Sequence, residues 1–251
     1  MKLAKTVLIA ALTLAATASF AQTPAKPSVV IVHGAFADGS DWAKVIPLLQ
    51  AKGVDVVAVQ NPLTSLEDDV AATQRAVAAQ PGKVVLVGHS WGGVVITQAG
   101  EDPKVSGLVY VAALAPDAGQ AGGELGKAYP PAPGFAFIQA DGAGYLKMSR
   151  EGIAKHFAQD VPAKTTDVMT ATQGPINGKA FEQKVTTAAW KTKPSWYIVA
   201  SKDHMIQPDQ QVAMAKTINA RVTTLATSHV PQQSQPAKVA AVILDAVNSA
   251  K

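Results

Sequence analysis

The chain has 251 residues, with 22 Lys and Arg against 18 Asp and Glu, and it contains no cysteine. The absence of cysteine excludes disulfide bonds and thiolate metal sites, and basic residues scattered singly without aromatic neighbours argue against nucleic acid as a partner. No stretch offers the run of about 20 apolar residues that a membrane-spanning helix needs.

The first 21 residues have the pattern of a secretory signal peptide. Lys2 and Lys5 precede the short apolar run 7–16, and small residues stand at the first and third positions before a cut after about Ala21. We therefore expect a periplasmic or secreted protein with no membrane anchor after signal removal. Without those two lysines, the 22 basic residues become 20 against 18 acidic ones, a net charge of +2. Residues 22–251 fit one α/β domain.

Continuous runs of β-branched and aliphatic residues predict strands that are buried on both faces, as in parallel sheets. Helical patterns alternate with these runs, which indicates parallel strands joined by right-handed crossovers. The predicted strands are 28–32, 54–59, 83–87, 107–112, 196–200 and 221–225. The predicted helices are one capped by Ser40, one from Ser65 to about Ala79, and 93–99, 209–218 and 237–247.

The alternation stops between about residues 116 and 193. This stretch contains a Gly-rich and Pro-rich piece, 119–134, and a helical fragment, 146–159, but no convincing buried strand. We expect it to form an inserted lid over the carboxyl ends of the strands, where open α/β sheets bind ligands.

The pentapeptide Gly88-His89-Ser90-Trp91-Gly92 lies between the predicted strand 83–87 and helix 93–99. In this context the G-x-S-x-G pattern holds its serine in a strained turn, with the hydroxyl exposed at the top of a sheet. Ser90 is therefore the candidate nucleophile. The alternative interpretation is a tight turn that needs glycine for packing and uses serine as a helix cap.

A serine nucleophile needs an imidazole to take its proton and an acid to orient that imidazole. Asp203 and His229 each follow a predicted core strand, so both reach the same sheet edge as Ser90. Asp117 is the rival acid and His204 the rival base. Asp203 is preferred because the chain around it is short and constrained, whereas Asp117 opens a Gly-rich segment.

Acyl transfer also needs backbone amides aimed at the developing oxyanion. The amide of Trp91 is one candidate, and Ala35 in the loop after the first strand is the other, with Phe36 as second choice. Phe36, Tyr145 and Met205 are candidate substrate-binding residues, and they favour a substrate with an apolar acyl or alcohol group. Packing is the competing role for the same side chains.

These motifs together resemble the small lid-bearing α/β-hydrolases. The segments His33–Phe36, Gly88–Gly92 and Ser228–Val230, with the Asp203 loop, are similar to the group that contains plant methylesterases, hydroxynitrile lyases and many bacterial small esterases. The resemblance covers nearly the whole mature chain. It implies an α/β-hydrolase fold with a mostly parallel sheet of about six strands, flanking helices and an inserted lid, and hydrolysis without a cofactor or metal.

Two positions separate esterases from lyases within that group. The lyases typically have Thr where Gly34 stands here, and Lys directly after the catalytic histidine, where this chain has Val230. The resemblance therefore implies a carboxylic-ester hydrolase acting on a small-molecule ester. Lactone or thioester hydrolysis at the same site, and a non-catalytic binding protein of the same fold, are the alternatives. The oligomeric state is left open.

Overall fold

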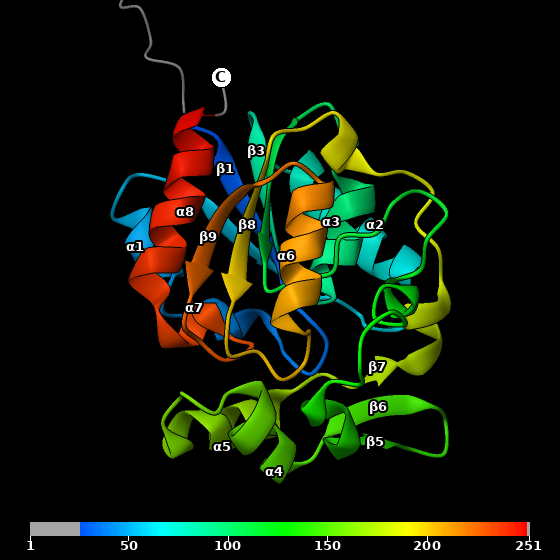
Figure 1. Cartoon of the computed structure of the whole chain (residues 1–251). Helices are drawn as coiled ribbons and strands as arrows, with labels where there is room; N and C mark the ends of the chain where they lie inside the picture. The colour runs from blue at the N-terminus through cyan, green and yellow to red at the C-terminus, as the bar shows by residue number, and fades with distance from the viewer. Residues whose placement is uncertain (1–25, 250–251) are drawn as a thin grey trace, which may run out of the picture.

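The structure, a computed structural model, describes residues 26–249, so the predicted signal peptide lies outside the described residues. Six parallel strands form one sheet in the order β2-β1-β3-β4-β8-β9 (Figure 1). This sheet and its flanking helices confirm the predicted fold class. The strands are β1 (Ser28–Val32), β2 (Val56–Val59), β3 (Val84–His89), β4 (Val105–Val111), β8 (Ser195–Ala200) and β9 (Arg221–Leu225).

Helices cover both faces of this sheet and make two hydrophobic cores. Val29 and Ile31 of β1 belong to the core under α1 and α8, whereas Val30 and Val32 belong to the core under α2, α3 and α6. Because successive side chains point to opposite faces, both sets must be apolar, which explains the continuous apolar runs. These helices are α1 (Ile46–Gln50), α2 (Leu66–Ala78), α3 (Gly92–Ala99), α6 (Pro208–Thr217) and α8 (Pro236–Ser249).

Of two helix caps predicted from the sequence, one is present in the structure and the other is not. Ser65 caps α2, as predicted, by accepting a hydrogen bond from the amide of Asp68 at 3.0 Å. The predicted cap at Ser40 is wrong, because the cap is Asp38, two residues earlier: its carboxylate accepts from the Ser40 amide at 2.6 Å at the start of the short helix η1 (Gly39–Trp42). A further short helix, α7 (Pro231–Ser234), directly follows the loop that carries His229.

Most of the segment between β4 and β8 forms a layer, the lid layer, that faces the carboxyl ends of the core strands, whereas its last part, residues 189–191, lies against α3 (Figure 1). The lid layer contains a small antiparallel sheet of mostly half-buried or exposed strands, whereas the sequence indicated no convincing buried strand, and residues 146–148 of the predicted helical fragment belong to that sheet. Strands of two to four residues are too short to leave a periodic pattern. The elements are η2 (Gly122–Glu124), η3 (Pro133–Phe137), β5 (Ile138–Ala140), β6 (Tyr145–Met148), α4 (Arg150–Gly152), η4 (Ile153–Phe157), α5 (Ala163–Thr172), β7 (Ile176–Asn177), η5 (Gly178–Glu182) and η6 (Ala189–Lys191).

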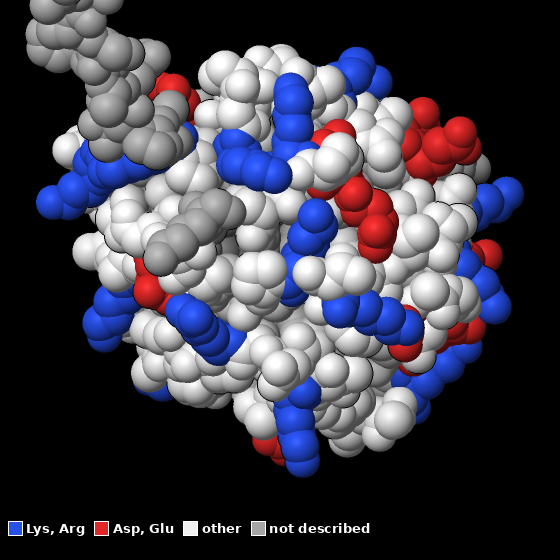
Figure 2. Space-filling view, turned by 90° about the horizontal axis from the view of Figure 1, so that it is seen from above, with Lys and Arg blue, Asp and Glu red and all other residues white. Residues whose placement is uncertain are grey.

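The described surface carries charge of both signs. On the face that Figure 2 presents, opposite the lid layer, Lys and Arg side chains are interspersed with Asp and Glu. Within residues 26–249, no helix has the length and apolar character that would let it cross a membrane.

A substitution at Leu86 tests how much side-chain packing on the central strand β3 contributes to the stability of the protein. Its side chain is completely buried, so Leu86→Ala removes packed methyl groups and should lower the free energy of unfolding by about 2–5 kcal/mol. Urea denaturation measures this. Val222→Ala, at a position 52% exposed on the edge strand β9, should change it by less than about 1 kcal/mol, and equal losses at both positions would contradict this account of the core.

Candidate active site

Ser90 lies in the turn between β3 and α3 with a left-handed backbone, φ 52°. The close approach of neighbouring chain explains the glycine two residues later, because a Cβ on Gly92 would overlap the carbonyl oxygen of Val32. The Ser90 amide donates to Val111 at 3.2 Å, and the Ser90 carbonyl accepts from Leu114 at 3.1 Å. Such strain costs about 1–3 kcal/mol and persists only where the surroundings hold it. The fold therefore fixes this serine in a turn.

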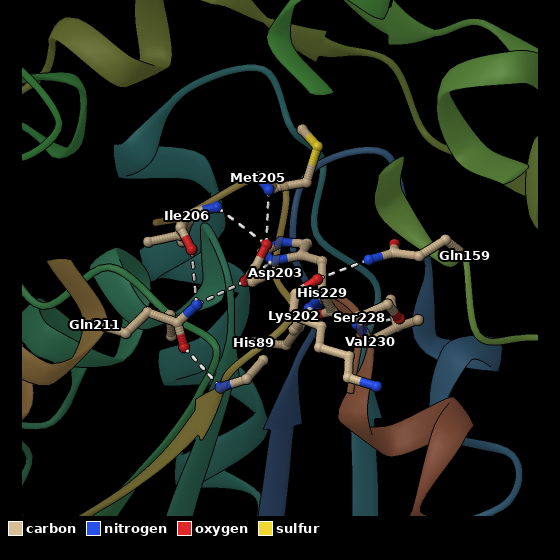
Figure 3. A network of polar contacts seen from close by, with 12 residues as sticks. His89, Gln159, Lys202, Asp203, Met205, Ile206, Gln211, Ser228, His229 and Val230 are labelled. Atoms are coloured by element: carbon tan, nitrogen blue, oxygen red, sulfur yellow. Dashed lines mark hydrogen bonds and ion pairs between the residues drawn. The ribbon is translucent and has the colours of Figure 1, made fainter. Parts of the chain in front are cut away.

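Asp203 follows β8, His229 follows β9, and the two side chains meet with His229 Nδ1 2.7 Å from Asp203 Oδ2 (Figure 3). Both are buried. Asp203 Oδ1 accepts from the amides of Met205 at 2.6 Å and Ile206 at 3.1 Å, and Oδ2 also accepts from Gln211 Nε2 at 2.7 Å. These bonds compensate the carboxylate for its lost water. Since Nδ1 is engaged, Nε2 is the ring nitrogen available for proton transfer.

The rival residues lie elsewhere. Asp117 is at the surface, where it forms an ion pair with Lys191 Nζ at 2.5 Å. His204 is half-buried, and its ring lies 5.3 Å from that of His156 in the lid layer. The structure thus places Asp203, and neither rival, in contact with His229.

A cavity of about 240 Å³ joins the candidate residues, because Ser90 and His229 both line it. Three other predicted residues, Ala35, Phe36 and Met205, line it too. The lid layer supplies most of the remaining apolar wall, namely Phe135, Ile138, Leu146, Phe157 and Phe181.

No hydrogen bond within residues 26–249 joins Ser90 to His229, and in free enzymes such contacts often tighten only when substrate binds.

Of the predicted substrate-binding residues, Tyr145 is the one that does not line this cavity. Tyr145 is half-buried on β6 and does not belong to the described residues that line the cavity, whereas its neighbour Leu146 does. Adjacent residues of a strand point to opposite faces, so only one of the two can face the cavity. The strand, which the sequence pattern did not indicate, decides which.

Two backbone amides are free to bind an oxyanion. Neither the Ala35 nor the Trp91 amide donates a hydrogen bond to any described residue. His33 holds the backbone next to the Ala35 amide in place. Its Nε2 accepts from the Asn61 amide at 3.0 Å, so its Nδ1 carries the proton and donates to the Gly34 carbonyl at 2.8 Å. Burial lowers the pKa of His33, which keeps this arrangement neutral.

His89 supports His229 without adding charge. The two rings lie 4.8 Å apart, and His89 Nε2 donates to the His229 carbonyl at 2.8 Å. Burial, followed by the proximity of His229, holds the pKa of His89 well below its ordinary value. A neutral neighbour leaves His229 free to accept a proton without repulsion.

Asp69 supports the serine turn, a role that its sequence position does not reveal. It lies in the first turn of α2, where an acidic residue suits the helix dipole. In the structure Asp69 Oδ2 accepts from the indole Nε1 of Trp91 at 2.7 Å, and Oδ1 accepts from the Leu63 amide at 2.8 Å. Burial raises the pKa of Asp69 to about 6. The residue next to Ser90 is thus anchored through its side chain.

Asp160, in the lid layer, fixes the histidine loop. Its Oδ2 accepts from the Ser228 amide at 2.9 Å and its Oδ1 accepts from the Ser234 hydroxyl at 2.7 Å. These two contacts bracket His229 on both sides in the sequence. The lid layer and the candidate base are therefore directly connected.

Asp41 is a buried acid behind the same loop. Its carbonyl accepts from Gln233 Nε2 at 2.7 Å, which joins η1 to α7, the helix that follows His229. Its Oδ2 has no hydrogen-bond partner among the described residues. Burial, followed by the nearby charge of Asp38, raises the pKa of Asp41 to about 7.

Comparison with known proteins gives consistent matches over most of the chain. A family model described as "Alpha/beta hydrolase family" matches residues 29–242. Probable hydrolase R7 of Phoma sp. is 27% identical over 247 residues, covering 88% of this chain and 98% of that protein. Methylesterase 8 of Arabidopsis thaliana is 25% identical over 233 residues, covering 84% and 86%. The crystal structure of polyneuridine aldehyde esterase has a TM-score of 0.80 at 22% identity, covering 88% and 98%, so it shares the fold.

Asp160→Ala should lower kcat about ten-fold with little change in KM, because losing the two bonds lets the His229 loop move. Asp160→Asn should retain most activity, since its amide can accept from Ser228 and donate to Ser234. Steady-state kinetics on an activated ester measures both. The control is Asp167→Ala, which breaks only the exposed pair with Arg150. If Asp160→Ala matches that control, the loop is held by other contacts.

The raised pKa of Asp41 makes stability depend on pH. As pH rises, the unfolded chain releases the proton near pH 4 and the folded chain only near pH 7, so the free energy of unfolding falls across this interval and is constant above it. Asp41→Asn cannot ionise. Its stability relative to the wild type should therefore rise between pH 4.5 and pH 8 by about 1 kcal/mol or more in urea titrations. If the wild type and Asp41→Asn change in stability in parallel over this range, the account of Asp41 is wrong.

Proposed function

The chain belongs to the α/β-hydrolase family, in its methylesterase-like group, and we propose that it cleaves small carboxylic esters through Ser90, His229 and Asp203. One observation carries this proposal. The His229 imidazole is hydrogen-bonded to the buried Asp203 at 2.7 Å, and it lines the same cavity as Ser90 in its strained turn. A serine, an imidazole and a carboxylate in this order are the parts that acyl transfer requires.

In the first half of the proposed reaction, Ser90 Oγ forms a bond to the ester carbonyl carbon while His229 Nε2 takes the hydroxyl proton. Asp203 keeps the proton on Nδ1 and stabilises the imidazolium that forms. The carbonyl oxygen becomes negative and accepts hydrogen bonds from the amides of Ala35 and Trp91. Each such donor contributes about 3–4 kcal/mol to the transition state.

Collapse of this intermediate breaks the bond between the carbonyl carbon and the alcohol oxygen. His229 Nε2 returns its proton to the leaving alcohol, and the acyl group stays on Ser90. Water then repeats the sequence: His229 takes one water proton, the hydroxyl attacks the acyl carbon, and Ser90 Oγ leaves with the proton. No redox step or external co-reactant other than water is needed.

Two residues support hydrolysis over cyanohydrin cleavage. A side chain at Gly34 would place its Cβ 2.8 Å from Ser90 Cβ, so the present packing has no room for a larger residue. Val230, after the candidate base, supplies no charge for an anionic leaving group. The name of Methylesterase 8 is in line with an ester substrate. The apolar cavity supports an ester with an apolar acyl or alcohol part.

We also propose that the protein acts outside the cytoplasm. The support is the charged start, the apolar run 7–16 and the small residues before the cut after about Ala21. Sequencing the amino terminus of protein recovered from a periplasmic fraction tests this proposal.

Ser90→Ala should lower kcat for a short acyl p-nitrophenyl ester by about 10³-fold or more, because no other group can carry the acyl intermediate. A fluorophosphonate probe should label the wild type but not this variant. Ser40→Ala, at an exposed serine, is the matched control and should retain activity and labelling. Full activity in Ser90→Ala would overturn the proposal. Faster hydrolysis of lactones or thioesters than of esters would change the substrate class without changing the nucleophile.

A further inference from the structure

One polar residue in the cavity has no role in the proposed reaction. Apart from Ser90 and His229, the cavity is lined, within the described part of the chain, by glycine and apolar residues and by a single amide side chain, Gln210 of α6. Gln210 is only 5% exposed. In such surroundings the amide gives up hydrogen bonds with bulk water, and the cavity wall has no polar protein group that replaces them.

The neighbouring glutamine shows what a structural role at this point of α6 requires. Gln211 Nε2 donates to Asp203 Oδ2 at 2.7 Å and to the Ile206 carbonyl at 2.8 Å, and its Oε1 accepts from the Ala200 amide at 2.9 Å (Figure 3). In contrast, no hydrogen bond among residues 26–249 involves the Gln210 amide group. The amide atoms of Gln210 are not among the enclosed unpartnered side-chain atoms of the described residues, so they reach the cavity, where a ligand or water supplies their partners.

The amide of Gln210 faces a lid residue that has no side chain. A Cβ added to Gly126, in the lid layer, would lie in ordinary contact with Gln210 Oε1, 4.0 Å away. Gly126 also lines the cavity. The amide of Gln210 therefore stands at the cavity surface, and a side chain at position 126 would narrow the cavity beside it.

We propose that Gln210 is a specificity-determining residue that pairs with an oxygen function on the apolar part of the substrate. This inference rests on the proposed esterase function and narrows its substrate class. The substrate is an ester whose acyl or alcohol chain bears a ketone or hydroxyl group remote from the scissile carbonyl. A ketone would accept from Gln210 Nε2, and a hydroxyl would donate to Oε1. The low polarity of the cavity strengthens such a bond and disfavours an all-carbon chain that leaves the amide unpaired.

Two series of esters test this inference: p-nitrophenyl octanoates and octyl acetates, each plain or carrying one ketone or hydroxyl at carbons 5 to 7 of the chain. The wild type should hydrolyse at least one substituted ester with a kcat/KM about ten-fold or more above its plain parent. Gln210→Met, which has a similar shape but no amide, should lose this preference and hydrolyse the plain esters faster. Gln50→Met, at an exposed position on α1, is the control and should retain the wild-type ratio.

A second variant and a second measurement keep the result interpretable. Gly126→Ala puts a methyl group against the Gln210 amide, so it should reduce kcat/KM for the preferred substituted ester more than for p-nitrophenyl acetate, whose acyl part is a single methyl group. In the Ser90→Ala background, octan-2-one and octan-2-ol should bind more tightly than 1-chlorooctane in calorimetry, and adding Gln210→Met should remove the difference.

The outcomes separate the two proposals. Equal substituted-to-plain ratios in the wild type and Gln210→Met, with hydrolysis still dependent on Ser90, would overturn the role of Gln210 and leave the esterase proposal intact. Hydrolysis that does not depend on Ser90 would overturn the esterase proposal, and the calorimetric comparison would then decide the ligand preference of Gln210 by itself.

Discussion

The site depends on one constraint, which is that the Asp203 carboxylate is buried and must be hydrogen-bonded. A buried charge without partners is strongly destabilising, and removing one partner typically costs about 3–5 kcal/mol. Here the donors come from three places: the loop amides of Met205 and Ile206, Gln211 on α6, and His229 after β9. Because all three must converge on two oxygen atoms, the acid loop, the helix and the histidine loop are fixed relative to one another. Orientation of the candidate base is a consequence of satisfying this carboxylate.

The lid layer contacts the His229 loop as well as covering the cavity. Phe157 of η4 packs edge-on against the His229 ring, with centroids 5.0 Å apart, while Asp160 holds the backbone on either side of that histidine. The core supplies the turn that holds Ser90, where Gly92 lets the chain pass close to β1. A change in lid position would therefore move both the cavity wall and the candidate base, which would couple substrate enclosure to the geometry of the proposed proton transfer.

The placement of residues that is set by local context could be predicted, and the placement of residues that is set by tertiary contacts could not. Ser90 stands in a recognisable turn, and Asp203 and His229 follow apolar strands whose carboxyl ends must meet in a parallel sheet. Asp160 and Asp69 carry no such local mark, because Asp160 contacts a residue 68 positions away and Asp69 resembles an ordinary helix-start acid. The position of Tyr145 relative to the cavity could not be predicted for a related reason, because its strand is too short to be visible in the sequence.

The pair Gln210 and Gln211 illustrates how far a sequence alone can distinguish structure from function. Adjacent helical residues point about 100° apart, so one of the two faces the Asp203 carboxylate and the other faces the cavity. The residue types are identical, and only the groups opposite them differ. Gln211 satisfies three protein groups and so stabilises the fold, whereas the Gln210 amide has no protein partner among the described residues and faces the cavity. In a cavity with apolar walls, a ligand oxygen is the group that can pair with this amide, which is why we assign Gln210 to substrate recognition.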